Sequence, residues 1–499
     1  MITVSYSALL RLLLPEVIVL AAALLVLAAD LLIARTAQMR IRFVTAAVIS
    51  GIGCISSIAQ IVCAPQQANV FNGTLIISPE TQLVQIALLV LTVLLVVLSI
   101  EASSFTSHVG EYFAVILFAT TGMMFLVSTE NVLLIFLSLE LLSLSLYVLA
   151  AFKKRSSHSA EAALKYFLFG GMSAAFLLFG LSLLYGLSNS INLVQIAHAI
   201  KSPRLDPLLA VAIVMIVLGF GFKVAAVPFH FWAPDVYEGA PANSAALIAS
   251  SAKVAGFVIF YQVMVIGFAG AEGSGDWRGH TPGWVPVVAV VAVLSMVLGN
   301  LVALTQTSVR RLLAYSAIAH AGYILLALVS HTEQSFIALL YYSITYALTL
   351  IGAFGVVSIV EEQVGGEKLS DFGGLSRRAP VLSSCMLIFM LSLAGIPPLA
   401  GFFGKFFLFA STLSAGQHTL GLLWLVVVAV AMSTVSIYYY LQVLKRIYIA
   451  EPPSEMRPIK VPNVSQLVLC AIALSILLLG CAPNLFLQWL QQPIRIAHF

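Results

Sequence analysis

Apolar residues run through this chain in continuous stretches, and polar residues gather in short segments between them. About 20 apolar residues in a helix cross a hydrocarbon core of roughly 30 Å. Because the stretches are continuous rather than alternating, they exclude a strand barrel. The pattern predicts an all-α polytopic membrane protein with about fourteen transmembrane helices, at residues 9–33, 41–63, 81–101, 112–128, 130–151, 162–187, 207–228, 241–267, 285–305, 311–330, 335–360, 380–412, 421–444 and 464–489.

Composition and charge agree with this pattern. Only 9% of the residues are charged and 61% are hydrophobic, with a mean hydropathy of +1.06, whereas soluble domains are about 25% charged. A net charge of +4 is too small to indicate a nucleic-acid partner.

The distribution of basic residues predicts how the chain is oriented in the membrane. Segments after odd-numbered helices hold sixteen Lys and Arg residues, and the segments after even-numbered helices, together with the termini, hold five. The positive-inside rule then predicts both termini on the outer side of the membrane.

Motifs for metals, redox cofactors and nucleotides are missing from the sequence. The five cysteines are scattered, without CxxC or Cys/His ligand spacing, which argues against zinc, iron–sulfur and haem c sites. No GxGxxG follows a strand pattern, and no GxxxxGK[ST] occurs. We therefore expect no metal and no cofactor-binding residue in this chain.

Among the charged residues inside the predicted helices, four are the main candidates for function, namely Glu140, Lys223, Lys253 and Lys405. Each charge opposes insertion by roughly 2.5–3.5 kcal/mol at a helix centre. A buried lysine releases its proton more easily than an exposed one, and a nearby carboxylate reverses this. The residues therefore point to a proton or ion pathway in which Glu140 modulates a lysine. Snorkelling to the interface and buried structural ion pairs remain the alternatives.

Two of these lysines lie in helices that glycine and proline interrupt. Lys223 precedes Pro228, and Lys405 follows Pro397 and Pro398. Broken helices at matching places in two halves are typical of transport sites. We predict that the seventh and twelfth helices are broken, and that helices 4–8 and 9–13 form two inverted five-helix repeats. The predicted parts are 1–111 (helices 1–3), 112–267 and 285–447 (the repeats), and 464–499 (helix 14 and the tail).

Other polar residues are weaker candidates. His320 is either a proton-pathway residue or a hydrogen-bonded core histidine. We expect His230 to be solvated at the cytoplasmic mouth. Glu161 and Lys165 are four apart, which favours a helical ion pair, with a functional role still open. The roles of two acidic residues in the first helix also stay open: Glu16 and Asp30.

Four long segments, at 140–186, 219–242, 310–326 and 390–409, resemble the antiporter-like membrane subunits of respiratory complex I. The stretch SAEAALKYF is more similar to the subunit N group, the counterparts of mitochondrial subunit 2, than to subunits M or L or the multisubunit sodium/proton antiporters. By this resemblance the protons move along a hydrated axis formed by Glu140, Lys223, Lys253 and Lys405. The segment GAPANSAALIASSAKVAG departs from the family pattern, which leaves the helix geometry around Lys253 open.

The resemblance implies a proton-translocating membrane-arm subunit of NADH–quinone oxidoreductase, without a redox centre of its own. NADH, FMN, iron–sulfur clusters and quinone are then expected in partner subunits. The implied partners are other membrane-arm subunits, including further antiporter-like ones, in a bacterial inner membrane. The alternatives are a subunit of a sodium/proton antiporter or another secondary transporter, and a structural spacer whose buried charges only orient helices.

Overall fold

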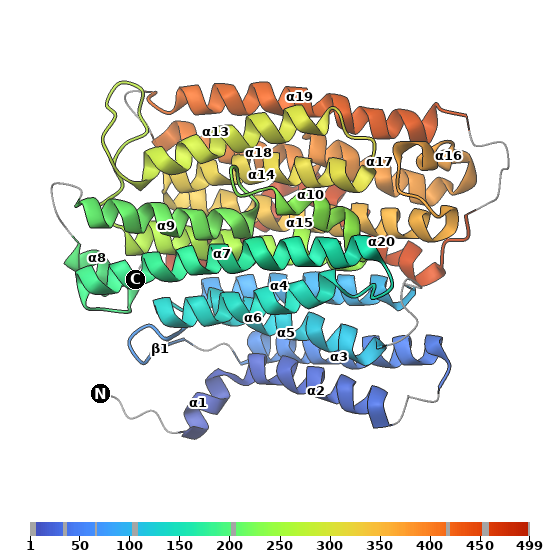
Figure 1. Ribbon diagram of the computed structural model, residues 1–499, viewed down its shortest axis with the longest axis horizontal. Helices are drawn as coiled ribbons and strands as arrows, with labels where there is room; N and C mark the ends of the chain where they lie inside the picture. The colour runs from blue at the N-terminus through green and yellow to red at the C-terminus, as the bar shows by residue number, and fades with distance from the viewer. Residues whose placement is uncertain are drawn as a thin grey trace.

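The long helices lie side by side in a flattened bundle, with α2 and α3 at one edge and α19 at the other (Figure 1). This computed structural model describes residues 6–32, 37–64, 67–101, 108–200, 206–415, 420–451 and 459–497. Within them, 13 helices are long and apolar enough to cross a membrane, and α17 and α18 form one further, interrupted pair. The predicted polytopic all-α fold is confirmed.

The helices and strands run in the order α1 (Tyr6–Leu12), α2 (Leu14–Leu32), α3 (Met39–Cys63), β1 (Ala68–Val70), β2 (Leu75–Ile77), α4 (Pro79–Leu98), η1 (Ser99–Glu101), α5 (Val109–Val127), α6 (Val132–Ala150), α7 (Ser157–Ser188) and α8 (Leu193–Ala199). They continue with α9 (Pro207–Val224), α10 (Trp232–Gly239), α11 (Ala242–Ala249), α12 (Ser251–Gln262), η2 (Val263–Gly267), α13 (Trp284–Ala303), α14 (Val309–Ser330) and α15 (Glu333–Val364). The remaining elements are η3 (Leu369–Phe372), α16 (Leu375–Arg378), α17 (Pro380–Ala394), α18 (Ala400–Ala415), α19 (Leu423–Tyr448), α20 (Asn463–Cys481) and α21 (Pro483–Ala497).

The two predicted helix breaks have the same backbone geometry. After α9, Ala225 is left-handed with φ 59°, and after α17, Gly395 is left-handed with φ 81°. In each break the first two N–H groups beyond the helix donate to one carbonyl, that of Gly221 in the first break and that of Leu391 in the second. These are the bonds that satisfy free carbonyls at a helix end. The interruption of the seventh and twelfth predicted helices is confirmed.

Three predicted helices are divided where we expected continuity, and the first of them, 9–33, is divided at Leu13 into α1 and α2. The helix at 241–267 is interrupted at Ser250, whose φ of −114° and ψ of −94° separate α11 from α12. The last predicted helix, 464–489, is wrong as a single element, because α20 ends at Cys481 and Pro483 begins α21. Proline lacks an N–H, so it fits the first turn of a new helix but not the interior of an old one.

A β-hairpin between α3 and α4 was not predicted. β1 and β2 pair antiparallel, with Ala68 opposite Ile77. Asn72 and Gly73 in the connection have φ values of 55° and 80°, as an Asn-Gly hairpin turn requires. In Figure 1, β1 and α8 lie at one end of the bundle and α16 at the other. We call the end that holds α16 the basic end, because α16 carries two of the sixteen basic residues.

The centre of the bundle is formed by α11–α12, α14 and α15. In the most apolar stretch of α14, 94% of the residues are buried, whereas in that of α2 only 33% are buried. Lys253 and His320 therefore lie on central helices, away from lipid. Some residues counted for orientation lie outside the described part of the chain, namely Arg35, Lys201, Arg204 and Arg457.

Candidate functional site

Lys223, in the last turn of α9, faces α6. Its ammonium nitrogen donates to Ser143 Oγ and lies 5.9 Å from the centre of the Tyr147 ring. Glu140 is close enough for its charge to act on Lys223, although no ion pair within 4.0 Å joins the two. Glu140, Ser143 and Tyr147 share a helix face because they are three and four residues apart. The structure thus brings the predicted pair together, with Ser143 as the direct contact that we had not predicted.

Lys253 lies on α12, three residues beyond the interruption at Ser250. Its side chain is only 2% exposed. Its nitrogen donates to the carbonyl of Ala317, on α14, at 3.1 Å. Ala317 lies one turn before His320 on the same helix, so Lys253 is positioned next to that histidine.

Lys405, on α18, reaches back to the end of α17. Its nitrogen donates to the carbonyls of Leu393 and Ala394 at 3.1 and 3.2 Å, and to Ser433 Oγ at 2.9 Å. The last carbonyls of a helix carry a partial negative charge and lack partners within the helix. The break in the twelfth predicted helix therefore supplies the acceptors that hold Lys405, which is 4% exposed.

His320 lies between the two buried lysines, and the charges of Lys253 and Lys405 both act on it. Its ring is 1% exposed. Nε2 lies 2.9 Å from the hydroxyl of Tyr440, and Nδ1 is hydrogen-bonded to the hydroxyl of Tyr342. Tyr440 also shares a hydrogen bond with Ser316. The histidine is therefore part of a buried network of hydroxyl groups that can accept and donate protons.

A group of ion pairs lies at the basic end, where α7, α10 and α14 meet. Lys165 pairs with Glu161 at 2.8 Å, which confirms the predicted helical pair, and with Asp235 at 2.6 Å. Arg311 pairs with Asp235 at 2.9 Å and with Glu238 at 2.8 Å. Burial alone would raise the pKa of Asp235, but the hydrogen bonds from Lys165 and Arg311 hold it below its usual value. These pairs fix α10 beside the first helix break.

Two basic side chains at this end differ from our expectation. Arg310, which we counted in a loop, is 2% exposed. It donates to the carbonyls of Tyr237 and Ala240, and it pairs with Glu361 at 3.1 Å. The prediction that His230 is solvated is wrong, because its side chain is buried and burial lowers its pKa. The contact with Tyr237 shows that α10 covers Arg310.

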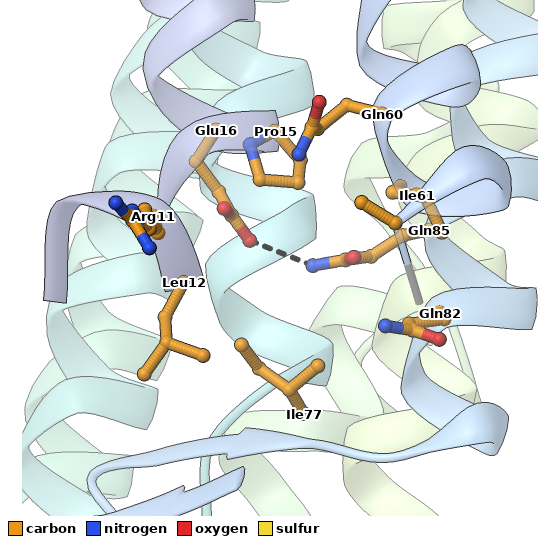
Figure 2. Close-up of a pocket in the computed structure, with 10 residues that line it drawn as sticks. Arg11, Leu12, Pro15, Glu16, Gln60, Ile61, Ile77, Gln82 and Gln85 are labelled. Atoms are coloured by element: carbon orange, nitrogen blue, oxygen red, sulfur yellow. Dashed lines mark hydrogen bonds between the residues drawn. The ribbon is translucent and has the colours of Figure 1, made fainter. Parts of the chain in front are cut away.

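The acidic residues of α2 connect helices outside the central axis. Gln85 donates to Glu16 Oε1 at 2.7 Å and to Ser128 at 2.8 Å. Figure 2 shows Glu16 pointing toward Gln85 in a small cavity that Gln60 and Gln82 also line. Asp30 accepts two hydrogen bonds from Arg42, at 2.7 and 2.6 Å, and one from the N–H of Gly110 at 3.0 Å. Both residues thus hold α2 against its neighbours.

The described part of the chain contains no group of three or more His, Cys, Asp and Glu side chains that could hold a metal ion. The buried lysines lie near an imidazole and several hydroxyl groups, which can accept and donate hydrogen bonds. Sequence reasoning missed Ser143, Ser433, Tyr342 and Tyr440. Only Ser143 had a signal, because it follows Glu140 by one helical turn.

Comparison with known proteins places these residues in a family. Residues 129–433 match a family model described as the transmembrane part of NADH:quinone oxidoreductase and Mrp antiporter subunits. The chain is 54% identical to NADH-quinone oxidoreductase subunit N 2 of Acidobacterium capsulatum, over 98% of this chain and 99% of that protein.

Solved structures agree with the sequence relatives. A chain of respiratory complex I from Thermus thermophilus, solved with bound aureothin, is 32% identical with a TM-score of 0.76, covering 95% of this chain and 98% of that one. A chain of the Mrp complex from Dietzia matches with a TM-score of 0.79 at 20% identity, covering 96% of each. The second likeness shows a common fold only.

Proposed function

This chain belongs to the family of NADH:quinone oxidoreductase and Mrp antiporter membrane subunits, and we propose that Glu140, Lys223, Lys253 and Lys405 carry protons through it. It is a multi-pass membrane subunit of NADH–quinone oxidoreductase, respiratory complex I, and takes part in its proton pumping. The similarity to a subunit N over nearly the full length supports this. The oxidoreductase reaction is that of the complex.

One observation carries the assignment of the lysines. Within the described residues, neither Lys253 nor Lys405 has a carboxylate within 4.0 Å, and both donate only to carbonyl and hydroxyl oxygens. A structural lysine in low-dielectric surroundings needs a counterion to offset its desolvation. A lysine without one is suited to exchange a proton, since burial disfavours its charged form. The geometry therefore speaks against buried ion pairs that only orient helices.

The redox chemistry is assigned to partner subunits. NADH, FMN, iron–sulfur clusters and quinone belong there, and other membrane-arm subunits, including antiporter-like ones, flank this chain. The runner-up, a subunit of a sodium/proton antiporter, rests on a structural likeness at 20% identity. The sequence identity of 54% to a NADH-quinone oxidoreductase subunit favours a role in complex I over a role in an antiporter.

Two further parts of the proposal concern architecture. Residues 112–267 and 285–447 form two repeats in opposite orientation, which the shared geometry at Ala225 and Gly395 supports. The basic end faces the cytoplasm, and both termini lie on the outer side of the bacterial inner membrane. The distribution of Lys and Arg supports this orientation.

The experiment is to purify a tagged form of this chain from its native membrane with its partners and to reconstitute the complex into vesicles. NADH-driven quinone reduction should acidify or alkalinise the lumen, as a pH-sensitive dye reports, and Lys253→Ala should abolish this signal in assembled complex. The isolated chain should neither oxidise NADH nor reduce quinone. If the isolated chain exchanges sodium for protons and co-purifies with no redox subunit, the antiporter function is correct instead.

A further inference from the structure

A buried amide side chain joins three helices near the second helix break. Asn300 lies on α13, within the apolar stretch VLGNLVA, and is 0% exposed. Its side-chain nitrogen donates to the carbonyl of Met296 at 2.7 Å and to the hydroxyl of Tyr323, on α14, at 3.0 Å. Its side-chain oxygen accepts a hydrogen bond from the hydroxyl of Tyr439, on α19, at 3.0 Å. Asn300 therefore connects α13 with both α14 and α19.

The partners of this amide fix its orientation. A backbone carbonyl oxygen only accepts hydrogen bonds, so the amide atom that faces Met296 is the nitrogen. The second N–H of this nitrogen is then directed at the hydroxyl oxygen of Tyr323. Rotation of the amide by half a turn would set its oxygen against the carbonyl oxygen of Met296. The side chain is therefore held with a donor toward Tyr323.

Two glycines bring α13 and α14 close enough for this contact. A Cβ on Gly299 would lie 2.5 Å from a backbone nitrogen of α14, and a Cβ on Gly322 would lie 2.7 Å from a backbone oxygen of α13. Small residues allow the backbones of membrane helices to approach each other in this way. Gly299 precedes Asn300 and Gly322 precedes Tyr323, so the close approach occurs where the amide meets the hydroxyl.

The ring of Tyr323 faces the buried ammonium of Lys405. The ammonium nitrogen lies 5.2 Å from the ring centre, within the roughly 6 Å over which a ring face attracts a cation. The ring is 0% exposed, and His320 lies edge-on to it at 5.6 Å with an interplanar angle of 89°. The oxygens to which Lys405 donates belong to uncharged groups. The Tyr323 ring therefore adds to the groups that stabilise the charged form of Lys405.

Other titratable groups near Lys405 come from two central helices. The charge of Lys405 acts on His320 of α14, and Tyr342 of α15 packs against Gly404, the neighbour of Lys405. From α17 and α19 the ammonium receives carbonyl oxygens and a serine hydroxyl. The three hydrogen bonds of Asn300 go to other residues than these. A change of Asn300 therefore reaches Lys405 through Tyr323.

We propose that Asn300 is a positioning residue for Lys405, because it holds the hydroxyl of Tyr323 and so keeps the face of that ring against the ammonium. This rests on the proposed function of Lys405. Without the hydrogen bond the ring is no longer anchored at its outer end, and the ammonium loses part of the attraction of the ring face. Asn300 acts on the charge of Lys405 without taking up a proton itself.

The first test compares Asn300→Leu with Tyr323→Phe in assembled complex reconstituted into vesicles. Leucine has nearly the shape of asparagine but makes no hydrogen bond, and phenylalanine keeps the ring but lacks the hydroxyl that Asn300 holds. Proton pumping should fall several-fold in both variants, and its profile against pH should shift by a similar amount in both. A parental profile in assembled Tyr323→Phe overturns the proposal, whether or not Asn300→Leu assembles.

The matched control is Tyr261→Phe, on α12. It also removes the hydroxyl of a buried tyrosine, and with it a hydrogen bond of 3.1 Å to the carbonyl of Thr332. The ring of Tyr261 packs on Phe336 with ring centres 4.8 Å apart. Thermal stability should fall in Tyr261→Phe as in Tyr323→Phe, whereas the pH profile of pumping should stay parental. An equal shift of the profile in the control overturns the positioning role.

The double variant Asn300→Leu/Tyr323→Phe tests whether the two residues act as one unit. Residues that act through a common contact show effects that do not add. The double variant should therefore shift the pH profile no further than either single variant. A shift equal to the sum of the two single shifts overturns the proposal, because Asn300 would then act independently of Tyr323.

The outcomes separate this proposal from the function on which it rests. If Lys405→Arg abolishes pumping while Asn300→Leu and Tyr323→Phe keep the parental pH profile, the positioning role is wrong and the proton-carrying role of Lys405 stands. If assembled Lys405→Arg pumps at the parental rate, the proposed function of Lys405 itself is wrong.

Discussion

Lys223 and Lys405 both lie at a helix break of the same geometry, but Lys223 precedes its break in the sequence and Lys405 follows its break. Ala225 and Gly395 occupy the same position in the two breaks, 170 residues apart (395 − 225 = 170). Lys223 lies two residues before Ala225, whereas Lys405 lies ten residues after Gly395 and folds back onto the carbonyls before it. The two lysines are thus placed by different chain segments at the same kind of helix end.

The position that corresponds to Lys405 in the first break is Asp235 (405 − 170 = 235), and its carboxylate pairs with Lys165 and Arg311. The second break holds a lysine without an acidic partner at this position, and the first holds an acid between two bases. The two breaks therefore share their backbone geometry but not the charge at this position.

Arginine in place of Lys253 or Lys405 separates a proton carrier from a structural cation. Arginine keeps the charge but does not release its proton in proteins. Lys253→Arg and Lys405→Arg should therefore assemble yet lose proton pumping by about tenfold or more, as expected for a proton-transfer group. Assembly is checked on native gels and pumping in reconstituted vesicles. Normal pumping by both variants would show that neither lysine is an obligatory carrier.

Removal of the Glu140 carboxylate should weaken coupling. Glu140→Ala leaves Lys223 without the charge that acts on it, so proton pumping and coupled NADH oxidation should both fall several-fold. Glu140→Asp keeps the carboxylate but shortens the side chain by one methylene. This variant should therefore retain part of both activities. Pumping at the parental rate in assembled Glu140→Ala complex would contradict the assignment of Glu140.

Ser143→Ala tests the direct contact of Lys223. Loss of a hydrogen bond to a charged group removes roughly 1.5–3 kcal/mol of stabilisation from that charge. Pumping should therefore fall and its pH dependence should shift, since the charged form of Lys223 loses its acceptor. Ser143→Thr keeps the hydroxyl and serves as the control. Identical pH profiles for the alanine variant and the parent would rule out this contact.

His320→Gln distinguishes a proton-pathway residue from a hydrogen-bonded core histidine. A glutamine amide donates and accepts hydrogen bonds toward Tyr342 and Tyr440 but does not take up a proton near neutral pH. The variant should assemble with near-parental thermal stability and pump more slowly. Parental pumping would instead identify His320 as a core residue that only satisfies the two tyrosines.

Asp235→Asn should lower thermal stability without changing its dependence on pH near neutrality. Partly exposed ion pairs contribute about 1 kcal/mol or less each, and this substitution weakens two of them. Because the pKa of Asp235 is held below its usual value, its stabilisation is complete above roughly pH 4 and is lost only as the pH falls through the folded pKa. The stability difference between variant and parent should therefore stay constant from about pH 6 to 8, outside this titration range.

The matched control is Glu161→Gln, because Glu161 is 62% exposed and its pair with Lys165 is screened by water. Thermal unfolding in detergent should shift less for Glu161→Gln than for Asp235→Asn. Equal shifts would show that Asp235 does not hold α10 in place.

The membrane spans and the helix breaks could be predicted from the sequence alone. Each membrane span depends on the transfer of its own residues into lipid, so a local average of hydropathy locates it. Gly395 and Pro398 marked a break for the same local reason, since backbone freedom and a missing N–H act within one turn. The turn at Asn72 and Gly73 carried an equally local signal that we overlooked.

The partners of the buried charges were decided only by the tertiary structure. That Lys223 donates to Ser143, that Lys405 reaches the carbonyl of Leu393, and that Arg310 is buried all depend on how helices far apart in sequence are rotated and positioned in depth. Hydropathy does not set these quantities, because a helix that is apolar on every side inserts equally well at any rotation. Close packing against neighbouring helices selects the rotation, and with it the atoms that each lysine meets.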